Sequence, residues 1–248
     1  MRPVSSLCSA CVAALLAPAA HAYRPFDSTD AAVADRGEIE IELGPVGFQR
    51  VAGQNYLIAP ALILNWGFAD RWELVLEGKQ FFAVDETSTG PKYRLDDVAA
   101  SAKTVLRAGA LQEQSGPSVA SELSILLPSI NGEPGTGASA ALIVSERWPA
   151  LAVHLNATAL WTRSHEPGFA GGVILEGPEA WTVRPVAEAI VSAERGASAE
   201  ASVLAGAIWR LGPQLALDAA LRVADETAGR IKEIRLGLTW AFALGGPR

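Results

Sequence analysis

Charged residues that could line an ion pathway recur at every second position, with apolar residues between them. In the clearest row, Glu38, Glu40 and Glu42 alternate with isoleucines. Successive side chains of a strand point to opposite faces, so charges spaced by two share one face. Inside a wide pore such charges would set ion selectivity, whereas in a narrow lumen they must pair, because unpaired buried charge is costly. The sequence leaves both hypotheses open: a charged pathway and a salt-bridged brace.

The same alternation along the chain predicts the side chains that face a lumen. The set contains acids, bases and two other polar residues: Glu38, Glu40, Glu42, Glu73, Glu77, Lys79, Asp97, Lys103, Arg107, Glu122, Arg147, His154, Asn156, Arg184, Glu188, Asp218, Arg222, Glu233 and Arg235. In a closed barrel the last strand neighbours the first, so we expect Arg235 to pair with the acidic row that begins at Glu38.

The residue types do not predict catalysis or metal binding. An outer-membrane phospholipase needs a lipid-facing serine two residues after its histidine, but Asn156 follows His154 at that spacing and faces inward. No paired aspartates accompany His165, as a protease of the Asp/His kind would require. No Cys/His cluster predicts zinc, no loop has the Asp/Asn spacing of a calcium motif, and no Gly-rich phosphate loop precedes a helix. We expect no catalytic residue, metal or cofactor.

The elements that would position these charges are strands with one polar and one apolar face. In residues 232–244 every second residue from Ile234 to Phe242 is apolar, and Arg235 lies on the other face. In residues 55–66 the same reading places Tyr56 and Ile58 on the outward face. About twelve such runs occur, with no helical stretch to cover an apolar face. The pattern predicts an all-β, transmembrane, antiparallel up-and-down β-barrel of about 12 strands with a polar lumen. A soluble periplasmic β-sandwich that binds a ligand is the alternative.

The lengths of the connections and the positions of the tryptophans provide two further indications of a membrane barrel. Short periplasmic turns should alternate with longer outer loops. The expected tight turns are 67–70, the one near residue 149 and 211–213; the expected long loops are 84–95, 128–137 and 225–231, while 109–116 and 177–182 fit the alternation less well. Six tryptophans fall on the periplasmic side and predict an aromatic belt: Trp66, Trp72, Trp148, Trp181, Trp209 and Trp240.

The N-terminus and the charge indicate the compartment. Arg2, an apolar stretch over residues 7–17 and Ala20-His21-Ala22 predict a secretory signal over residues 1–22. Removing the signal removes Arg2 and both cysteines, and lowers the net charge from −7 to −8, which disfavours nucleic acid as a partner. We expect an irregular segment over residues 23–36, at the mouth or in the lumen, and a barrel over residues 37–248. The expected location is the bacterial outer membrane. The expected partners are the lipid bilayer, small-molecule solutes and the barrel-assembly machinery.

Short motifs spread over the chain resemble a known family. They are Arg24-Pro25-Phe26, Thr29-Asp30-Ala31, Gly37-Glu38, the strand from Asp97 to Lys103, Leu127-Pro128-Ser129 with the Gly-rich loop to Gly137, Val153-His154-Leu155-Asn156 and Leu217-Asp218-Ala219. Together they resemble an outer-membrane transporter family associated with phenol degradation by the meta pathway, although Asp96 replaces a usual glycine and Ser129-Ile130 departs from its turn. The resemblance implies a barrel and a passive transporter or channel for small molecules, and names no substrate. A structural barrel with a plugged lumen and no transport is the alternative.

Overall fold

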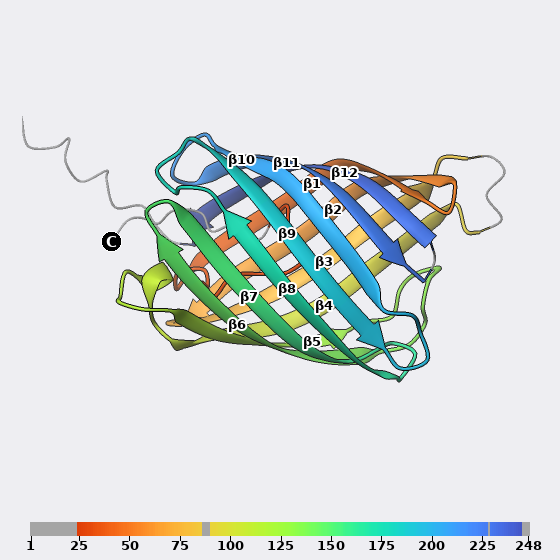
Figure 1. The fold of residues 1–248 in the computed structure, drawn as a ribbon, viewed down its shortest axis with the longest axis horizontal. Helices are drawn as coiled ribbons and strands as arrows, with labels where there is room; N and C mark the ends of the chain where they lie inside the picture. Colours follow the sequence, from red (N-terminus) through yellow and green to blue (C-terminus); the bar gives the residue numbers. More distant parts are fainter. Residues whose placement is uncertain (1–23, 86–89, 228, 245–248) are drawn as a thin grey trace, which may run out of the picture.

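A computed structural model of the chain describes residues 24–85, 90–227 and 229–244. Within them, twelve antiparallel strands close into one barrel in which each strand pairs with its sequence neighbours and β1 pairs with β12 (Figure 1). The strands are β1 (Glu38–Val51), β2 (Gln54–Ala69), β3 (Trp72–Ala83), β4 (Tyr93–Arg107), β5 (Ser118–Leu126), β6 (Gly137–Trp148), β7 (Leu151–Trp161), β8 (Pro167–Glu176), β9 (Val183–Glu194), β10 (Glu200–Arg210), β11 (Leu215–Glu226) and β12 (Gly229–Ala243). The predicted up-and-down barrel is confirmed, and the sandwich alternative is wrong. The predicted signal and Tyr23 lie outside the described residues.

Alternation along each strand separates an apolar exterior from a polar interior. In β12, Ile234 and Leu236 are exposed on the outside, whereas Glu233 and Arg235 are buried inside. Leucine, isoleucine and valine side chains of most strands are likewise exposed on the outer surface. A continuous exposed apolar surface of this kind fits contact with lipid, where apolar side chains lose nothing by facing outward. No helix in the described part of the chain has the length and apolar character needed to cross a membrane.

A β-bulge in β2 reverses part of the predicted alternation. The register with β3 shifts between Ile58 and Ala61, and both side chains are buried inside the barrel, where they pack against Phe81. Tyr56 packs against the same cluster. The expectation that Tyr56 and Ile58 face outward is therefore wrong, because an extra residue in one strand changes the face of every residue before it.

The two ends of the barrel do not differ in loop length as expected. We call the end that carries residues 38 and 243 the proximal end, and the opposite end the distal end. Distal connections include long ones over 84–92 and 127–136, but β11 ends at Glu226 and β12 begins at Gly229. The predicted long loop over 225–231 is wrong, because both strands extend further and an Arg230–Asp225 ion pair of 2.8 Å joins them.

The six tryptophans of the predicted belt are all exposed, by 41% to 55%. They lie at the proximal ends of their strands or, for Trp181, in the proximal connection between β8 and β9. Trp161 lies at the distal end of β7. Because all six indoles ring one edge, they are placed as an interfacial belt requires.

Residues 24–36, which we call the plug, lie inside the barrel. Phe26 packs against Ile174 and Leu204, and Ala31 is fully buried against Ile143. Two wall glycines make room for the plug: a Cβ on Gly237 would lie 2.2 Å from Arg24 Nε, and one on Gly67 would lie 2.1 Å from the Asp35 carbonyl oxygen. The interior core therefore consists of plug and wall together.

Candidate functional site: a cavity floored by the plug

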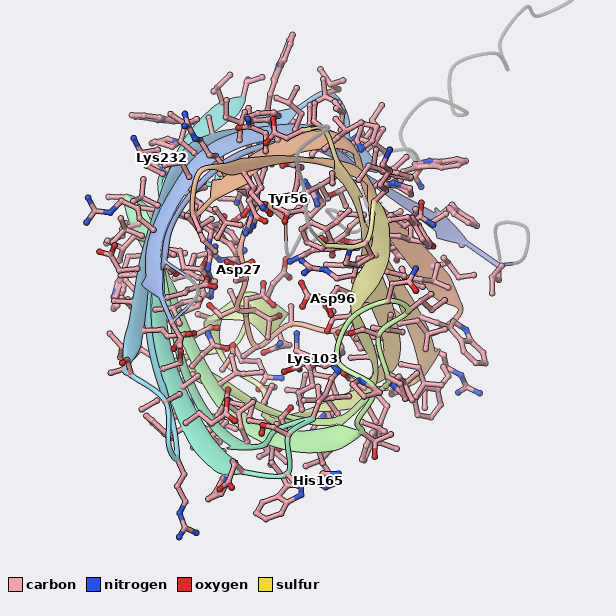
Figure 2. The ribbon with its side chains drawn as sticks, turned by 90° about the vertical axis from the view of Figure 1, so that its right-hand side faces the viewer. Asp27, Tyr56, Asp96, Lys103, His165 and Lys232 are labelled. Carbon is pink, nitrogen blue, oxygen red and sulfur yellow. The ribbon has the colours of Figure 1, made fainter. Side chains whose placement is uncertain are left out.

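A cavity of about 930 Å³ occupies the distal part of the lumen. Its lining includes strand residues near the distal end, such as Val51 and Glu226, and the plug residues Asp27, Ser28 and Thr29. Figure 2 looks along the barrel from the end opposite the C-terminus and shows Asp27, Asp96 and Lys103 pointing into the lumen. The plug thus separates this cavity from the proximal end.

The described residues lining the cavity include more acids than bases. The acids are Asp27, Glu77, Asp96, Asp97, Glu122, Glu133, Glu200, Glu226 and Glu233; the bases are Arg24, Lys79, Arg94, Arg222 and Arg235. Several bases are already engaged: Lys79 lies 3.2 Å from Asp97, and Arg94 lies 3.1 Å from Asp96. The cavity therefore has an excess of negative charge.

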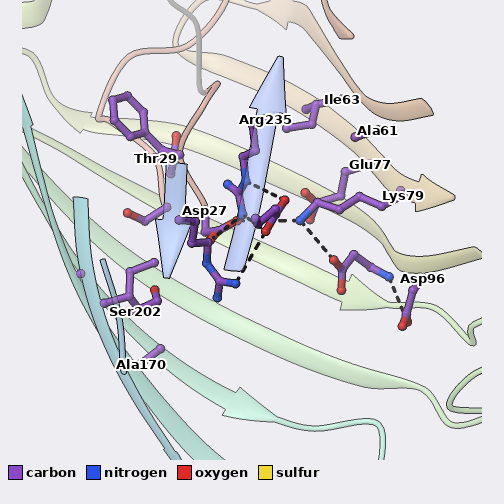
Figure 3. A pocket seen from close by; sticks show the side chains of 18 of the residues that line it. Asp27, Thr29, Ala61, Ile63, Glu77, Lys79, Asp96, Ala170, Ser202 and Arg235 are labelled. Carbon is purple, nitrogen blue, oxygen red and sulfur yellow. Dashed lines mark hydrogen bonds and ion pairs between the residues drawn. The ribbon is translucent and has the colours of Figure 1, made fainter. Parts of the chain in front are cut away.

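Asp27 joins the plug to three basic side chains of the wall (Figure 3). Its carboxylate lies 2.8 Å from Arg235 on β12, 2.9 Å from Arg222 on β11 and 3.8 Å from Lys79 on β3. Burial alone would raise the pKa of Asp27, but the charges of Arg235, Lys79 and Arg222 outweigh it and hold this pKa well below its usual range. Asp27 is therefore ionised at neutral pH and links strands on two sides of the lumen.

Wall side chains also satisfy the backbone of the plug next to Asp27. Glu188 accepts hydrogen bonds from the backbone N–H of Asp27 (2.9 Å), the backbone N–H of Ser28 (2.8 Å) and the Ser28 hydroxyl (2.5 Å). The Asn156 side chain donates to the Thr29 carbonyl oxygen at 2.7 Å. Buried backbone groups without strand pairing need such partners, so inward polar residues of the wall fix the path of the plug.

The acidic row of β1 does not pair with Arg235 as predicted. Arg235 lies opposite Gly47 in the register of β1 and β12, and its guanidinium bonds Glu233 at 2.9 Å in addition to Asp27. The row contacts the plug instead, because Glu42 accepts a 2.7 Å hydrogen bond from the Arg24 backbone N–H. The predicted pairing fails because the strand register sets Arg235 nearer the distal end than Glu38, Glu40 and Glu42.

Lys103 is the cation that faces the proximal part of the plug. Its side chain is 0% exposed and lies 3.6 Å from Glu73 and 3.7 Å from Asp30, and its ammonium donates to Thr29 Oγ1 at 3.1 Å. Glu73 also accepts a 2.7 Å hydrogen bond from the Ala34 backbone N–H. One buried cation thus connects β4, β3 and the plug.

A serine, a histidine and a glutamate form a chain beneath the plug. Ser145 Oγ lies 2.8 Å from His154 Nδ1, and His154 Nε2 lies 3.1 Å from Glu176. Serine, histidine and carboxylate in this order resemble a nucleophilic triad. Here, however, the Ala31 backbone N–H donates to Ser145 Oγ at 2.9 Å, and none of the three residues lines the cavity. The chain therefore serves as an anchor for the plug.

The predicted lumen residues occupy three kinds of position. Eight line the cavity: Glu77, Lys79, Asp97, Glu122, Asn156, Arg222, Glu233 and Arg235. Ten lie under the plug or in the proximal part of the interior: Glu38, Glu40, Glu42, Glu73, Lys103, Arg147, His154, Arg184, Glu188 and Asp218.

Arg107 was predicted to face the lumen, and this prediction is wrong. It is exposed at the proximal end of β4, where its guanidinium donates to the carbonyl oxygens of Ser115 (3.3 Å) and Pro117. A bulge between Val105 and Arg107 takes the side chain out of the alternation and turns it toward the β4–β5 connection. Arg107 braces this connection and does not line the lumen.

The sequence analysis missed the plug residues as members of the site. Arg24, Asp27, Ser28 and Thr29 make most of the contacts described above, but they have no strand period. The one signal was composition: residues 27–30 read Asp-Ser-Thr-Asp, a polar stretch suited to a polar lumen.

Comparisons with known proteins place the fold among outer-membrane channels. A scan of protein-family models and a search of curated protein sequences find no match to the chain. Among solved structures, the NanC porin matches with a TM-score of 0.60 and 7% identity over 82% of this chain and 98% of that chain. An outer membrane channel from Pseudomonas putida F1 matches with a TM-score of 0.59 and 13% identity, over 87% and 98%. The KdgM porin, solved in complex with disordered oligogalacturonate, matches with a TM-score of 0.57 and 13% identity, over 83% and 99%.

Proposed function

We propose that the chain is a channel of the bacterial outer membrane that gives small molecules a passive route, and that the plug controls this route. The observation that carries the proposal is the cavity of about 930 Å³ whose floor is the plug. Hydrogen bonds, ion pairs and side-chain packing hold the plug to the wall, and within the described residues no strand pairing does. Such a segment can leave the lumen without opening the barrel.

The charge of the cavity supports small cations and neutral molecules as solutes. Acids outnumber bases in the lining, and the low-dielectric wall strengthens their field inside the lumen. A polyanion such as the oligogalacturonate found with the KdgM porin would be repelled here. The resemblance to the phenol-degradation family adds small neutral aromatic compounds to the solutes worth testing. Assembly by the barrel-assembly machinery is part of the same proposal.

The test is planar-bilayer recording of the purified protein and of a variant that lacks residues 24–36. We expect low conductance for the intact chain, a clear rise after the deletion, and a reversal potential that shows cation preference. Anion preference in the deleted form would contradict the charge argument. Heat-modifiable migration on gels would establish that both proteins are folded.

A structural barrel with a permanently plugged lumen is the second candidate. The buried contacts of Lys103 and Glu42 with the plug favour it, because breaking buried polar contacts is costly. The same planar-bilayer recordings distinguish the two functions. A permanently plugged barrel would show no openings and no solute flux in the intact chain under any condition, whereas the proposed channel would show both.

A further inference from the structure

Two basic side chains lie directly opposite each other on the outer surface near the distal end. Arg50 of β1 and Lys232 of β12 are cross-strand partners, and both are exposed. Figure 2 shows Lys232 on the outside of the barrel wall. Neither side chain makes a hydrogen bond or an ion pair within the part of the chain that the structure describes. Like charges directly opposite on neighbouring strands destabilise a sheet, so an anion between them would offset a real cost.

The charges next to this pair leave it positive. Arg230 lies beyond Lys232 on the same face, but Asp225 binds it at 2.8 Å and cancels its charge. Asp85 is an acid close to Arg50, and its carboxylate accepts hydrogen bonds from the Asn55 backbone (2.7 Å) and side chain (3.1 Å). These Asn55 hydrogen bonds, and then the Arg50 charge, hold the pKa of Asp85 below its usual range.

The surface from the pair toward the middle of the barrel is apolar. The next outward pairs in the same register are Phe48 with Ile234, and Val46 with Leu236. All four side chains are exposed by 41% to 48%. A molecule bound here would therefore meet two cations at one end and a strip of apolar side chains below them.

The height of the pair matches the outer boundary of a membrane. Lys232 and Trp240 are eight residues apart in β12, and Trp240 belongs to the belt at the proximal end. At about 3.4 Å per residue and a strand tilt of about 40°, the two lie roughly 21 Å apart along the barrel axis. Because the apolar band of such barrels is about 25 Å tall, the backbone at Lys232 and Arg50 lies about 4 Å inside its distal boundary, and these long side chains reach the headgroup level of the distal leaflet.

We propose that Arg50 and Lys232 form a binding site for the phosphate headgroup of a lipid in the distal leaflet. A guanidinium binds phosphate with two parallel hydrogen bonds, and an ammonium adds a point charge. The acyl chains of the same lipid would lie on Phe48, Ile234, Val46 and Leu236, which continue directly from the basic pair. The site is on the outer surface, so it does not depend on whether the lumen conducts.

The test is native mass spectrometry of the purified full-length barrel with lipid A that carries two phosphates and with its dephosphorylated form. We expect the phosphorylated lipid to bind and the double variant Arg50→Gln/Lys232→Gln to bind it roughly tenfold or more weakly, since each basic residue at a membrane surface contributes a severalfold gain. The control variant Arg71→Gln/Arg195→Gln loses two exposed arginines elsewhere and should bind as the unchanged protein does. The charge-conserving variant Arg50→Lys/Lys232→Arg should retain most of the binding.

Three results would overturn the proposal. One is equal binding of phosphorylated lipid A by the unchanged protein and the Arg50→Gln/Lys232→Gln variant. Another is equal binding of the phosphorylated and dephosphorylated lipids. The third is complete competition by millimolar inorganic phosphate, which would show an anion site without a lipid. The single variant Arg50→Gln provides the same comparison if the double variant does not fold, as judged by its heat-modifiable migration.

Discussion

The proximal and distal parts of the lumen are built from the same alternating strands, yet they treat their charges differently. In the proximal part, the plug covers the inward side chains, so that Lys103 and Glu42 are fully buried and bonded. In the distal part, inward residues such as Glu77 line a cavity of about 930 Å³. The difference shows that one pattern of polar residues can form either a buried, paired network or the lining of a cavity, and that the segment lying over it determines which one forms.

The largest effect is expected from a substitution that disrupts the buried ion pairs of Lys103. Lys103→Met removes the buried cation that faces Glu73 and Asp30. Because removing one partner of a buried ion pair costs about 3–5 kcal/mol, we expect a loss of this size in the free energy of unfolding. Urea titration of the protein refolded in lipid vesicles would measure it. Lys92→Met, at an exposed distal position, is the control and should change stability by far less. Equal tolerance of both substitutions would contradict the role of Lys103.

The next effect compares the outer surface with the lumen. Leu236 lies midway between Trp240 and Lys232 on the exposed face of β12, so Leu236→Arg should cost about 2–4 kcal/mol. Val223 lies opposite Lys232, near the boundary, so Val223→Arg should cost about 0–1 kcal/mol. The same urea titration measures both. A smaller cost at Leu236 than at Val223 would show that the membrane position derived from the tryptophan belt is wrong.

A third prediction concerns the junction of the two parts of the lumen. Asp27→Asn removes the anion that Arg235, Arg222 and Lys79 hold, and it leaves the remaining plug contacts in place. We expect more frequent opening in planar-bilayer recordings than in the unchanged protein, but less than after deletion of the plug. Asp225→Asn, an exposed acid outside the lumen, is the control and should leave the recordings unchanged.

The smallest expected effect is a pH dependence at the distal rim. The folded-state pKa of Asp85 is lowered by its hydrogen bonds to Asn55, so this acid stabilises the fold above its unfolded-state pKa of about 3.9. The contribution is lost as the pH falls through the lower folded-state value. Asp85→Asn should therefore reduce the unfolding midpoint slightly at pH 7, and the difference should shrink below about pH 4. A difference that grows on acidification would contradict this sign.

Strand number, closure and the two faces of most strands followed from period-two patterning, because lipid and lumen impose opposite chemistry on alternate residues. The patterning failed where the backbone departs from a regular pleat. At Ile58 an extra residue changed the face of the residues before it, and at Arg107 a bulge turned the side chain toward a connection. The predicted loop lengths were wrong for a related reason. The strands of the β11–β12 hairpin continue through polar residues that the sequence analysis had assigned to a loop.

The sequence identified many of the inward charges of the strands, since a side chain's face depends on local alternation, but it misplaced Arg107 and did not name Asp96 or Glu226 of the cavity lining. It was not sufficient to predict the partners of the inward charges. Arg235 bonds Asp27 and not the acidic row, because the stagger of a closed barrel sets which residues of the first and last strands meet. The path of residues 24–36 has no period to reveal it. It depends on where Glu188, Asn156 and Ser145 converge, and side chains from distant strands come together only once the barrel is closed.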